Sequence, residues 1–196
     1  MTRLRVGVLV SGQGSNLQAL IDAARDPLYP ARVVLVCANR PCPALDIARK
    51  AGASRQVFRL VDYPDRKARD LDMARALRFH DVDLVVCAGY DAVLEHALVR
   101  QFKGRIINIH PSLLPEFAGT MDAVRMALEA GVSETGCTVH VVTDDVDRGP
   151  ILEQRRVEVR PDDTVESLRA RIQEQEHALL PAVVKRIAGQ ALPLMV

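Results

Sequence analysis

The sequence predicts an α/β fold with a doubly wound, mostly parallel sheet, an antiparallel C-terminal extension and a long terminal helix. Valine-rich apolar runs recur along the first part of the chain, and helical patterns separate them, as in βαβ units. Because these runs are continuous and do not alternate with polar residues, they are typical of strands covered on both faces. The candidate strands are residues 4–10, 32–38, 82–88 and 105–109. The candidate helices between them are residues 16–25, 44–51 and 66–79.

The pattern changes after Leu94. Residues 136–159 predict two strands around a polar turn, and residues 163–188 predict the long terminal helix. The 196 residues contain no linker rich in Pro, Gly or Ser and no block of charge. We therefore expect one domain over residues 1–196.

The charge balance favours small-molecule ligands. Lys and Arg number 26 and Asp and Glu 25, which gives a formal net charge of +1 without strong clustering. Such a balance argues against nucleic acid or a membrane surface as a partner. The N-terminal residues do not form a signal sequence and no apolar run reaches about 18 residues, so we expect a cytoplasmic protein. The sequence leaves monomer and homodimer open.

The cysteines are expected to be reduced and structural. Cys37, Cys42, Cys87 and Cys137 show no C-x-x-C spacing, and most of them lie inside apolar runs. Cysteine in such a run behaves as a small hydrophobic residue. The sequence therefore predicts neither a metal nor a redox site at these positions.

The turn after the first strand, SGQGSN, is a candidate anion site. It has no Lys-Ser or Lys-Thr pair, so it is unlike a nucleoside-triphosphate loop. Gly12 and Gly14 match half of a dinucleotide fingerprint, but Leu17 stands where the third glycine belongs. Backbone N–H groups at the helix start attract a phosphate monoester, with Gly14, Ser15 and Asn16 in contact and Ser15 or Asn16 as cap. The alternative is a tight turn in which the glycines only permit positive φ.

The stretch RIINIHPSLLP carries the strongest chemical signal. If the strand runs through Ile109, Asn108 and His110 lie on the same face, about 6.6 Å apart along the chain. Pro111 keeps the backbone of His110 extended, so its imidazole projects from the strand end. The pair is suited to hold one reacting centre at the ligand-binding edge of the sheet. The alternative is a core histidine bound to a neighbouring carbonyl.

The acidic turn DDVDRGP follows in the chain. Turn chemistry predicts that Asp144 and Asp145 are solvated turn residues. Asp147 precedes a Gly-Pro turn, from which its carboxylate could reach the sheet edge and pair with His110. For His140, on the preceding strand, the pattern leaves open whether it merely lines the pocket wall.

A carboxylate interrupts the apolar stripe of the terminal helix. The stripe consists of Val165, Leu168, Ile172, Leu179, Val183 and Ile187, and Glu176 occupies the position that completes it. Because an unpaired buried charge is costly, Glu176 must extend to solvent, pair with a protein cation or meet a cationic group of a ligand. Gln173 lies one turn earlier on nearly the same side, so both are candidate substrate-binding residues.

Five motifs together resemble one known family. SGQGSNLQALIDA, NIHPSLLP, GCTVH, DRGPI and QEQEH are similar, in order and spacing over essentially the whole chain, to the phosphoribosylglycinamide formyltransferase family. The resemblance implies the formyltransferase fold. It also implies transfer of the formyl group of 10-formyltetrahydrofolate to the amine of glycinamide ribonucleotide in purine biosynthesis.

The resemblance assigns roles by position. It implies a catalytic trio of Asn108, His110 and Asp147, and a phosphate-binding turn at residues 14–16, with Glu176 near the substrate amine. The residues implied to bind the folate are Arg66, Tyr90, Asp91, Ala92, Val93, Asn108 and Asp144. Three departures from the family pattern stand out: residues 90–92 lack its usual arginine, Arg148 occupies a position that is more often small, and the loop at 115–125 has one extra residue.

The residues also predict a mechanism. Attack of an amine on a formyl carbon creates an oxyanion and a cationic nitrogen, so the site needs donors and a route for a proton. Asn108 and a protonated His110 would supply the donors, and Asp147 would favour the imidazolium and help move the proton. No metal or covalent intermediate is required.

Other classes explain less of the pattern. Methionyl-tRNA formyltransferase carries an extra C-terminal domain and formyltetrahydrofolate deformylase an N-terminal regulatory domain, for which we expect no room in this chain. An NADP-dependent oxidoreductase would use Gly12, Gly14 and Arg40, but the third glycine of its fingerprint is missing. A nucleotide-binding module without catalytic activity does not account for Asn108, His110 and Asp147 together.

Overall fold

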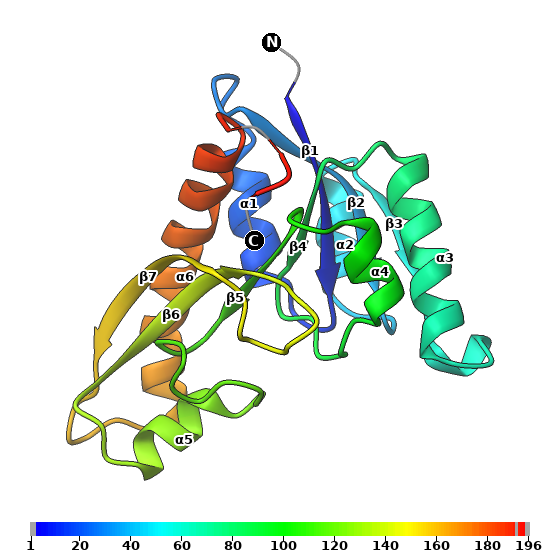
Figure 1. The fold of residues 1–196 in the computed structure, drawn as a ribbon. Coiled ribbons are helices and arrows are strands. Elements are labelled where there is room, and N and C mark those ends of the chain that lie inside the picture. Colours follow the sequence, from blue (N-terminus) through cyan, green and yellow to red (C-terminus); the bar gives the residue numbers. More distant parts are fainter. Residues whose placement is uncertain (1–2, 191, 195–196) are drawn as a thin grey trace.

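The computed structural model of the protein describes residues 3–190 and 192–194. Its centre is a seven-stranded sheet with the order β3-β2-β1-β4-β5-β6-β7 (Figure 1). The strands are β1 (Leu4–Val10), β2 (Ala31–Ala38), β3 (Ser54–Val57), β4 (Leu84–Cys87), β5 (Ile106–His110), β6 (Glu134–Val141) and β7 (Ile151–Glu158).

The strands from β1 to β5 pair in parallel, whereas β6 is antiparallel to both of its neighbours. The doubly wound, mostly parallel sheet with an antiparallel C-terminal extension is therefore confirmed. The register of β5 and β6 pairs Asn108 with His140 and His110 with Thr138. This pairing brings both polar residues of β5 next to polar residues of β6.

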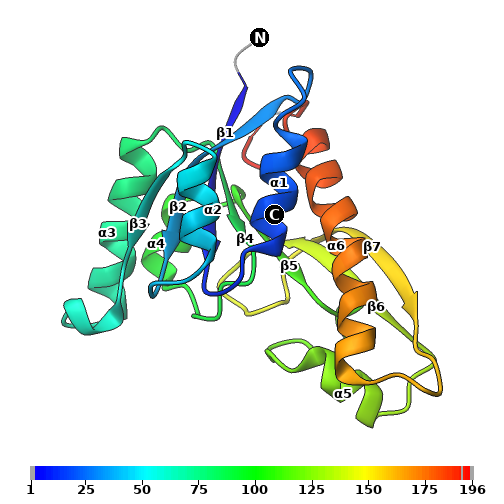
Figure 2. The same ribbon diagram turned by 180° about the vertical axis from the view of Figure 1, so that it is seen from behind.

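Helices cover both faces of the sheet (Figures 1 and 2). They are α1 (Ser15–Ala23), α2 (Ala44–Lys50), α3 (Arg66–Phe79), α4 (His96–Gln101), α5 (Ala123–Glu129) and α6 (Val165–Ile187), with a 3-10 turn at Leu60–Asp62. Alternate residues of β1 enter the two cores: Val8 packs with α1, α2 and α6, and Leu9 packs with α3 and α4. Strands buried on both faces explain the continuous apolar runs of the sequence.

The differences from the predicted elements have physical reasons. β3 has the sequence SRQV and is mostly exposed, so it lacks the apolar run that marks the other parallel strands. The helices α4 and α5 are too short for a clear helical period. The terminal helix, expected at 163–188, spans Val165–Ile187 and continues through Pro181.

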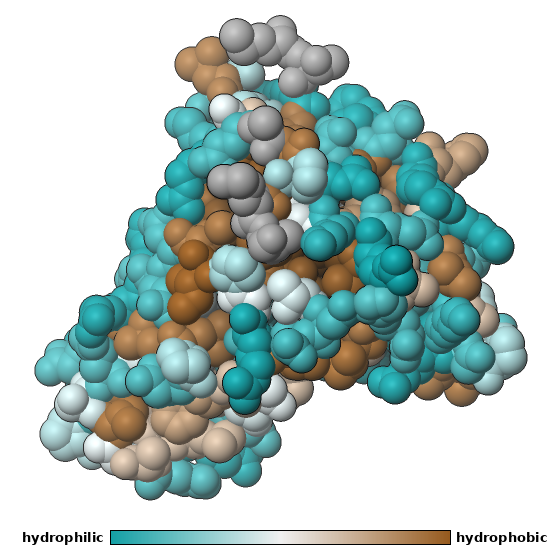
Figure 3. All heavy atoms as spheres, in the orientation of Figure 1, coloured by the Kyte–Doolittle hydropathy of each residue, from teal (hydrophilic) through white to brown (hydrophobic). Residues whose placement is uncertain are grey.

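The carboxyl ends of β1, β4 and β5 meet at one end of the molecule. The first residues of β1 and the last of α6 lie at the opposite end, at the top of Figure 1. Hydrophilic residues spread over most of the face in Figure 3, with smaller hydrophobic areas between them. Within the described residues, no helix is long and apolar enough to cross a bilayer.

Candidate functional site

A cavity of about 500 Å³ lies at the carboxyl ends of β1, β4 and β5. This is where the strand order of a doubly wound sheet reverses, the usual ligand site of such folds. Its walls come from the turn after β1, the segment after β4, the end of β5, the loops around residues 119–121 and 142–147, and α6. Of the residues predicted from sequence, it is lined by Gly14, Ser15, Asn16, Tyr90, Asp91, Ala92, Val93, Asn108, His110, Asp144, Asp147, Gln173 and Glu176.

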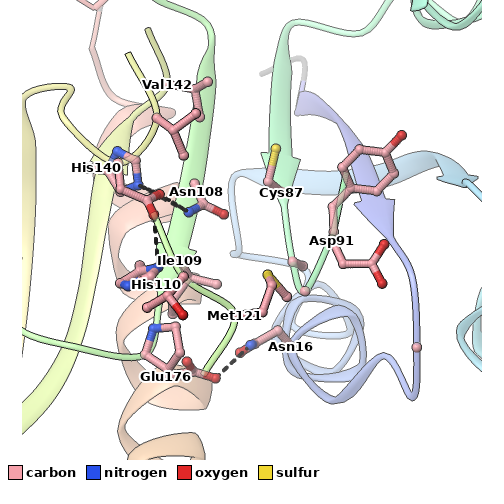
Figure 4. Close-up of a pocket in the computed structure, with 18 of the residues that line it drawn as sticks. Asn16, Cys87, Asp91, Asn108, Ile109, His110, Met121, His140, Val142 and Glu176 are labelled. Atoms are coloured by element: carbon pink, nitrogen blue, oxygen red, sulfur yellow. Dashed lines mark hydrogen bonds and ion pairs between the residues drawn. The ribbon is translucent and has the colours of Figure 1, made fainter. Parts of the chain in front are cut away.

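The side chains of Asn108, His140 and Asp147 form a hydrogen-bonded group, and Figure 4 labels Asn108 and His140. Asn108 Nδ2 lies 3.1 Å from His140 Nε2 and donates to Asp147 Oδ1 at 3.4 Å. His140 Nδ1 lies 3.1 Å from the Val141 carbonyl oxygen, and its Nε2 faces Asp147 as well as Asn108, 3.4 Å from Asp147 Oδ1. The structure thus answers the open question about His140, which lines the cavity and orients the Asn108 amide.

His110 faces the same carboxylate. Its Nδ1 lies 3.4 Å from Asp147 Oδ2, which is the contact predicted from the acidic turn. Its Nε2 lies 3.0 Å from the Phe117 carbonyl, to which it donates. Burial lowers the pKa of His110 below 6.5, and this outweighs the opposing attraction to Asp147 and the Phe117 hydrogen bond. Burial thus favours the neutral imidazole in the unliganded protein, whereas the sequence led us to expect the protonated form, and the catalytic role of His110 stays a prediction.

Asp147 is held from several sides. Its backbone is in the left-handed region, at φ 53°, which an aspartate tolerates better than most residues. The Gly119 N–H donates a 2.8 Å hydrogen bond to Oδ2, so the loop before α5 closes over the carboxylate. Burial raises the pKa of Asp147, but hydrogen bonds from His140 and Gly119 and attraction to His110 lower it further, so its pKa lies below 3.8. The carboxylate is ionised throughout the neutral range.

The turn after β1 differs in one detail from its prediction. Helix α1 begins after Gly14, which has φ 80°, and no side chain caps it. Asn16 points instead to α6, and Ser15 makes no capping bond, so the expected cap is wrong. The first N–H groups of α1 therefore face the cavity with the positive end of the helix dipole.

Glu176 is buried, with 6% of its surface exposed. Its side chain does not extend to solvent, and among the described residues it forms no ion pair with a cation. Of the three possibilities given above, a cationic group of a ligand is the one that remains. Its Oε2 accepts a 2.9 Å hydrogen bond from Asn16 Nδ2 (Figure 4). Burial raises the pKa of Glu176 to about 7, against a smaller lowering by the Asn16 hydrogen bond. Near neutral pH the carboxyl group is balanced between its two protonation states.

The segment after β4 is fixed by a polar network. The carboxylate of Asp91 pairs with the Arg40 guanidinium and accepts a 2.7 Å hydrogen bond from Asn39 Nδ2. The Asp91 N–H donates to Ser11 Oγ at 3.0 Å. Arg40, which the NADP-dependent alternative above would use, is thus paired with Asp91. The Tyr90 hydroxyl is buried without a partner in the described residues, and burial raises its pKa.

Arg66 does not line the cavity. It begins α3 and forms a 3.2 Å ion pair with Glu95. The Glu95 N–H donates a 2.7 Å hydrogen bond to Asp70, which itself forms a buried 2.7 Å ion pair with Arg69. Arg66 thus lies beside the segment that lines the cavity but does not line it itself. Its direct contact with the folate stays a prediction.

The acidic turn divides as the sequence suggested. Asp144 and Asp145 are exposed, and Asp144 lines the cavity while its Oδ1 lies 2.5 Å from His96 Nδ1. Arg148 is exposed and only its backbone N–H is engaged, with the Asp145 carbonyl at 3.3 Å.

Several residues of the site were not found by sequence reasoning. Gly119, which lines the cavity, and Phe117, which binds His110, contribute backbone atoms, and these leave no signature in side-chain patterns. Arg169 lines the cavity from α6, where a surface arginine looks like any other. In the described part of the chain, no group of three His, Cys, Asp or Glu side chains is arranged to hold a metal ion.

The cysteines are free thiols. Cys87 lines the cavity, and burial raises its pKa to about 12. A thiol with such a pKa stays neutral and is a poor nucleophile.

Comparison with known proteins agrees with these features. The family model described as formyl transferase matches residues 4–184. Phosphoribosylglycinamide formyltransferase of Mycobacterium tuberculosis is 45% identical over 191 residues, which cover 97% of this chain and 88% of that protein. The trifunctional purine biosynthetic protein adenosine-3 of Bos taurus is 44% identical over 193 residues, 98% of this chain. The chain spans only 19% of that protein and 14% of its Drosophila pseudoobscura counterpart.

Solved structures give the same result. The TM-score is 0.93 to glycinamide ribonucleotide transformylase 1 from Symbiobacterium toebii, at 45% identity over 95% of this chain and 88% of that one. It is 0.91 to phosphoribosylglycinamide formyltransferase from Brucella melitensis, at 39% identity over 99% and 100% of the two chains. The resemblance predicted from the motifs is thereby confirmed. With a family model that matches nearly its whole length, the chain belongs to the formyl transferase family.

Proposed function

We propose that the protein transfers the formyl group of 10-formyltetrahydrofolate to the amine of glycinamide ribonucleotide in purine biosynthesis. The observation that carries the proposal is the position of the Asp147 carboxylate, 3.4 Å from both His110 Nδ1 and Asn108 Nδ2 at the end of β5. A cavity of about 500 Å³ around these groups is within the usual size range of small-molecule sites. The proposed partners are the two small molecules alone, and the proposed location is the cytoplasm.

The donors of the site suit an oxyanion. Asn108 Nδ2 is held by His140 and Asp147 at the cavity wall, and preorganised donors of this kind stabilise charge that develops in a transition state. As the amine attacks, the new C–N bond forms at the formyl carbon and the carbonyl oxygen becomes negative. Asn108 is proposed to donate to that oxygen.

The proton route uses the neutral form of His110. Because burial lowers its pKa, the imidazole is free to accept the amine proton as the C–N bond forms. The ionised Asp147 then stabilises the imidazolium at 3.4 Å. Collapse of the intermediate breaks the bond between the formyl carbon and the folate nitrogen, and the proton passes from His110 to that nitrogen. This order keeps the roles expected for His110 and Asp147 but starts from the uncharged histidine.

The two substrates are proposed to occupy different walls of the cavity. The uncapped start of α1 suits the phosphate of the ribonucleotide, and Gln173 and Glu176 on α6 suit its polar groups and amine. The segment 90–93 and Asp144, which line the cavity from the side of α4, are proposed to contact the folate. That segment lacks the arginine of the family pattern, so this chain has one folate-tail contact fewer than the pattern implies.

A single assay tests the proposal. The purified protein is mixed with 10-formyltetrahydrofolate, with and without glycinamide ribonucleotide, and release of tetrahydrofolate is followed together with the mass of the ribonucleotide. We expect release only when the ribonucleotide is present, and a gain of one formyl group by it. Release without the ribonucleotide would indicate hydrolysis, as in the deformylase, and would contradict the proposal.

A further inference from the structure

Arg169 is the only lysine or arginine that lines the cavity, considering the residues that the structure describes. The lining also holds four carboxylates: Asp91, Asp144, Asp147 and Glu176. Three of these already have a cationic or histidine neighbour, and Glu176 is held by Asn16. In the described ranges Arg169 forms no ion pair within 4.0 Å, so the cavity contains one uncommitted permanent cation.

A counter-charge near Arg169 is solvent-exposed. Glu166 lies one turn earlier on α6, and its pKa is lowered by hydrogen bonds at the start of that helix and then by attraction to Arg169 and Arg125. An exposed pair of this kind is weak, because water screens it. Glu166 therefore leaves the Arg169 guanidinium available to a ligand in the cavity.

The position of Arg169 follows from the packing of α1 against α6. The two helices lie side by side and run in the same direction in Figures 1 and 2. Asn16, at the start of α1, binds Glu176, and the Tyr29 hydroxyl beyond its end binds the Pro181 carbonyl. Arg169 precedes Glu176 by two helical turns, about 10 Å. It therefore lies past the start of α1, on the side to which the first N–H groups of α1 point.

A second observation concerns a buried acceptor at the start of α1. Asn16 is nine-tenths buried and lines the cavity, yet its Oδ1 has no hydrogen-bond partner in the described residues. A buried acceptor without a donor is costly, so a hydroxyl or amine of a ligand is expected there. The ligand must thus carry a donor near Asn16 and an anion between α1 and Arg169, which matches a sugar phosphate.

We infer that Arg169 makes the site selective for a phosphate monoester, by binding the phosphate opposite the N–H groups of α1. The inference rests on the proposed function for the identity of the full substrate, but not for the phosphate contact. The guanidinium is always charged and offers a planar pair of donors that fits phosphate oxygens. If this contact is lost, the affinity for the phosphate monoester should fall by about tenfold to a hundredfold.

The test compares Arg169→Gln and Arg169→Lys with Arg125→Gln. Arg125 is the matched control, because it is an exposed arginine of α5 near the same Glu166 but does not line the cavity. Calorimetry measures the Kd of ribose 5-phosphate, and the assay measures KM for glycinamide ribonucleotide and for the ribonucleoside that lacks the phosphate. For Arg169→Gln we expect Kd and the ribonucleotide KM to rise by about tenfold or more, with kcat and the ribonucleoside KM unchanged. Arg169→Lys should lie between Arg169→Gln and the wild type.

Three results would overturn the inference. They are an equal effect of Arg125→Gln, an equal loss for the ribonucleoside, and no binding of ribose 5-phosphate by the wild-type protein. The proposed function fails separately. If ribose 5-phosphate binds through Arg169 but no formyl group is transferred, the phosphate site stands and the transferase assignment does not.

Discussion

Asn16 Nδ2 donates a 2.9 Å hydrogen bond to Glu176 Oε2 and so joins the turn after β1 to the terminal helix inside the cavity (Figure 4). The two residues are 160 positions apart in the chain. A buried carboxyl group whose only partner is a neutral amide is poorly stabilised as an anion. The buried carboxyl group therefore lowers the free energy of unfolding, and it is placed where a ligand can reach it.

Glu176→Gln should stabilise the protein in a pH-dependent way. The pKa of Glu176 is about 7 in the folded state and near 4.5 when unfolded. Folding favours the protonated form, so the free energy of unfolding decreases as the pH rises from about 4.5 to 7 and then levels off. Gln removes this decrease while keeping an acceptor for Asn16. Urea unfolding should show a gain that is small at pH 5 and reaches about 3 kcal/mol at pH 8. An equal gain at both pH values, or in the exposed control Glu174→Gln, would contradict the assignment.

The same substitution should impair substrate binding. Because Glu176 lines the cavity with one oxygen held by Asn16, its remaining oxygen is proposed to meet the substrate amine. Glu176→Gln should therefore raise KM for glycinamide ribonucleotide while the protein stays folded. Steady-state kinetics measures this effect. An unchanged KM would assign Glu176 a purely structural role.

Asp147→Asn should lower kcat by about 10² or more while both substrates still bind. Asparagine is nearly the same size, but it removes the negative charge that stabilises the His110 imidazolium at 3.4 Å. The loss should appear equally in kcat and kcat/KM, as for an interaction made mainly in the transition state. Asp145→Asn is the control, since Asp145 is exposed in the same turn and lies outside the cavity lining. Comparable losses in the two variants would remove Asp147 from the mechanism.

The His110 imidazole should titrate below pH 6.5 in the free protein, because its burial outweighs the attraction to Asp147. Asp147→Asn should move the midpoint lower still, since it removes one of the effects that raise the pKa. Proton NMR of the imidazole signals measures both midpoints, with His110→Gln to assign the resonance. A midpoint above 6.5 would restore the protonated histidine as the resting state.

Gly14→Ala should destabilise the fold, whereas Gly12→Ala should be nearly neutral. Gly14 has φ 80°, and an added Cβ would lie 2.7 Å from Ala44 Cβ and 2.9 Å from its Cα. Nothing lies within 4 Å of a Cβ at Gly12. Backbone strain and overpacking together predict a loss of about 2–5 kcal/mol for Gly14→Ala in urea unfolding. Equal stability of the two variants would show that α2 moves aside without cost.

Gly14 also has a structural role, because its Cα packs against α2. From sequence, Gly14 is expected to allow a phosphate to approach the backbone, and a larger residue there would act on ligand affinity. The structure adds a close contact with α2, so substitutions at Gly14 test folding first. Binding at this turn is better tested at Arg169.

Local patterns predicted the parts of the site that lie on one strand. The period of two placed Asn108 and His110 together, and the acidic turn placed Asp147 within reach of His110, because these relations depend on backbone geometry. The remaining features depend on contacts between distant segments. The Asn16 hydrogen bond to Glu176, the Arg40 pair with Asp91 and the burial that lowers the pKa of His110 each arise only when the elements pack.

The ends of the chain have a consequence for tethering. β1 begins, and Leu194 binds the Gly104 carbonyl just before β5, at the amino ends of the strands, whereas the cavity lies at their carboxyl ends. The arrangement is compatible with the trifunctional relatives, in which the matching segment makes up 19% or less of the length. The loops that line the cavity are thus on the side of the sheet edge away from both described ends of the chain.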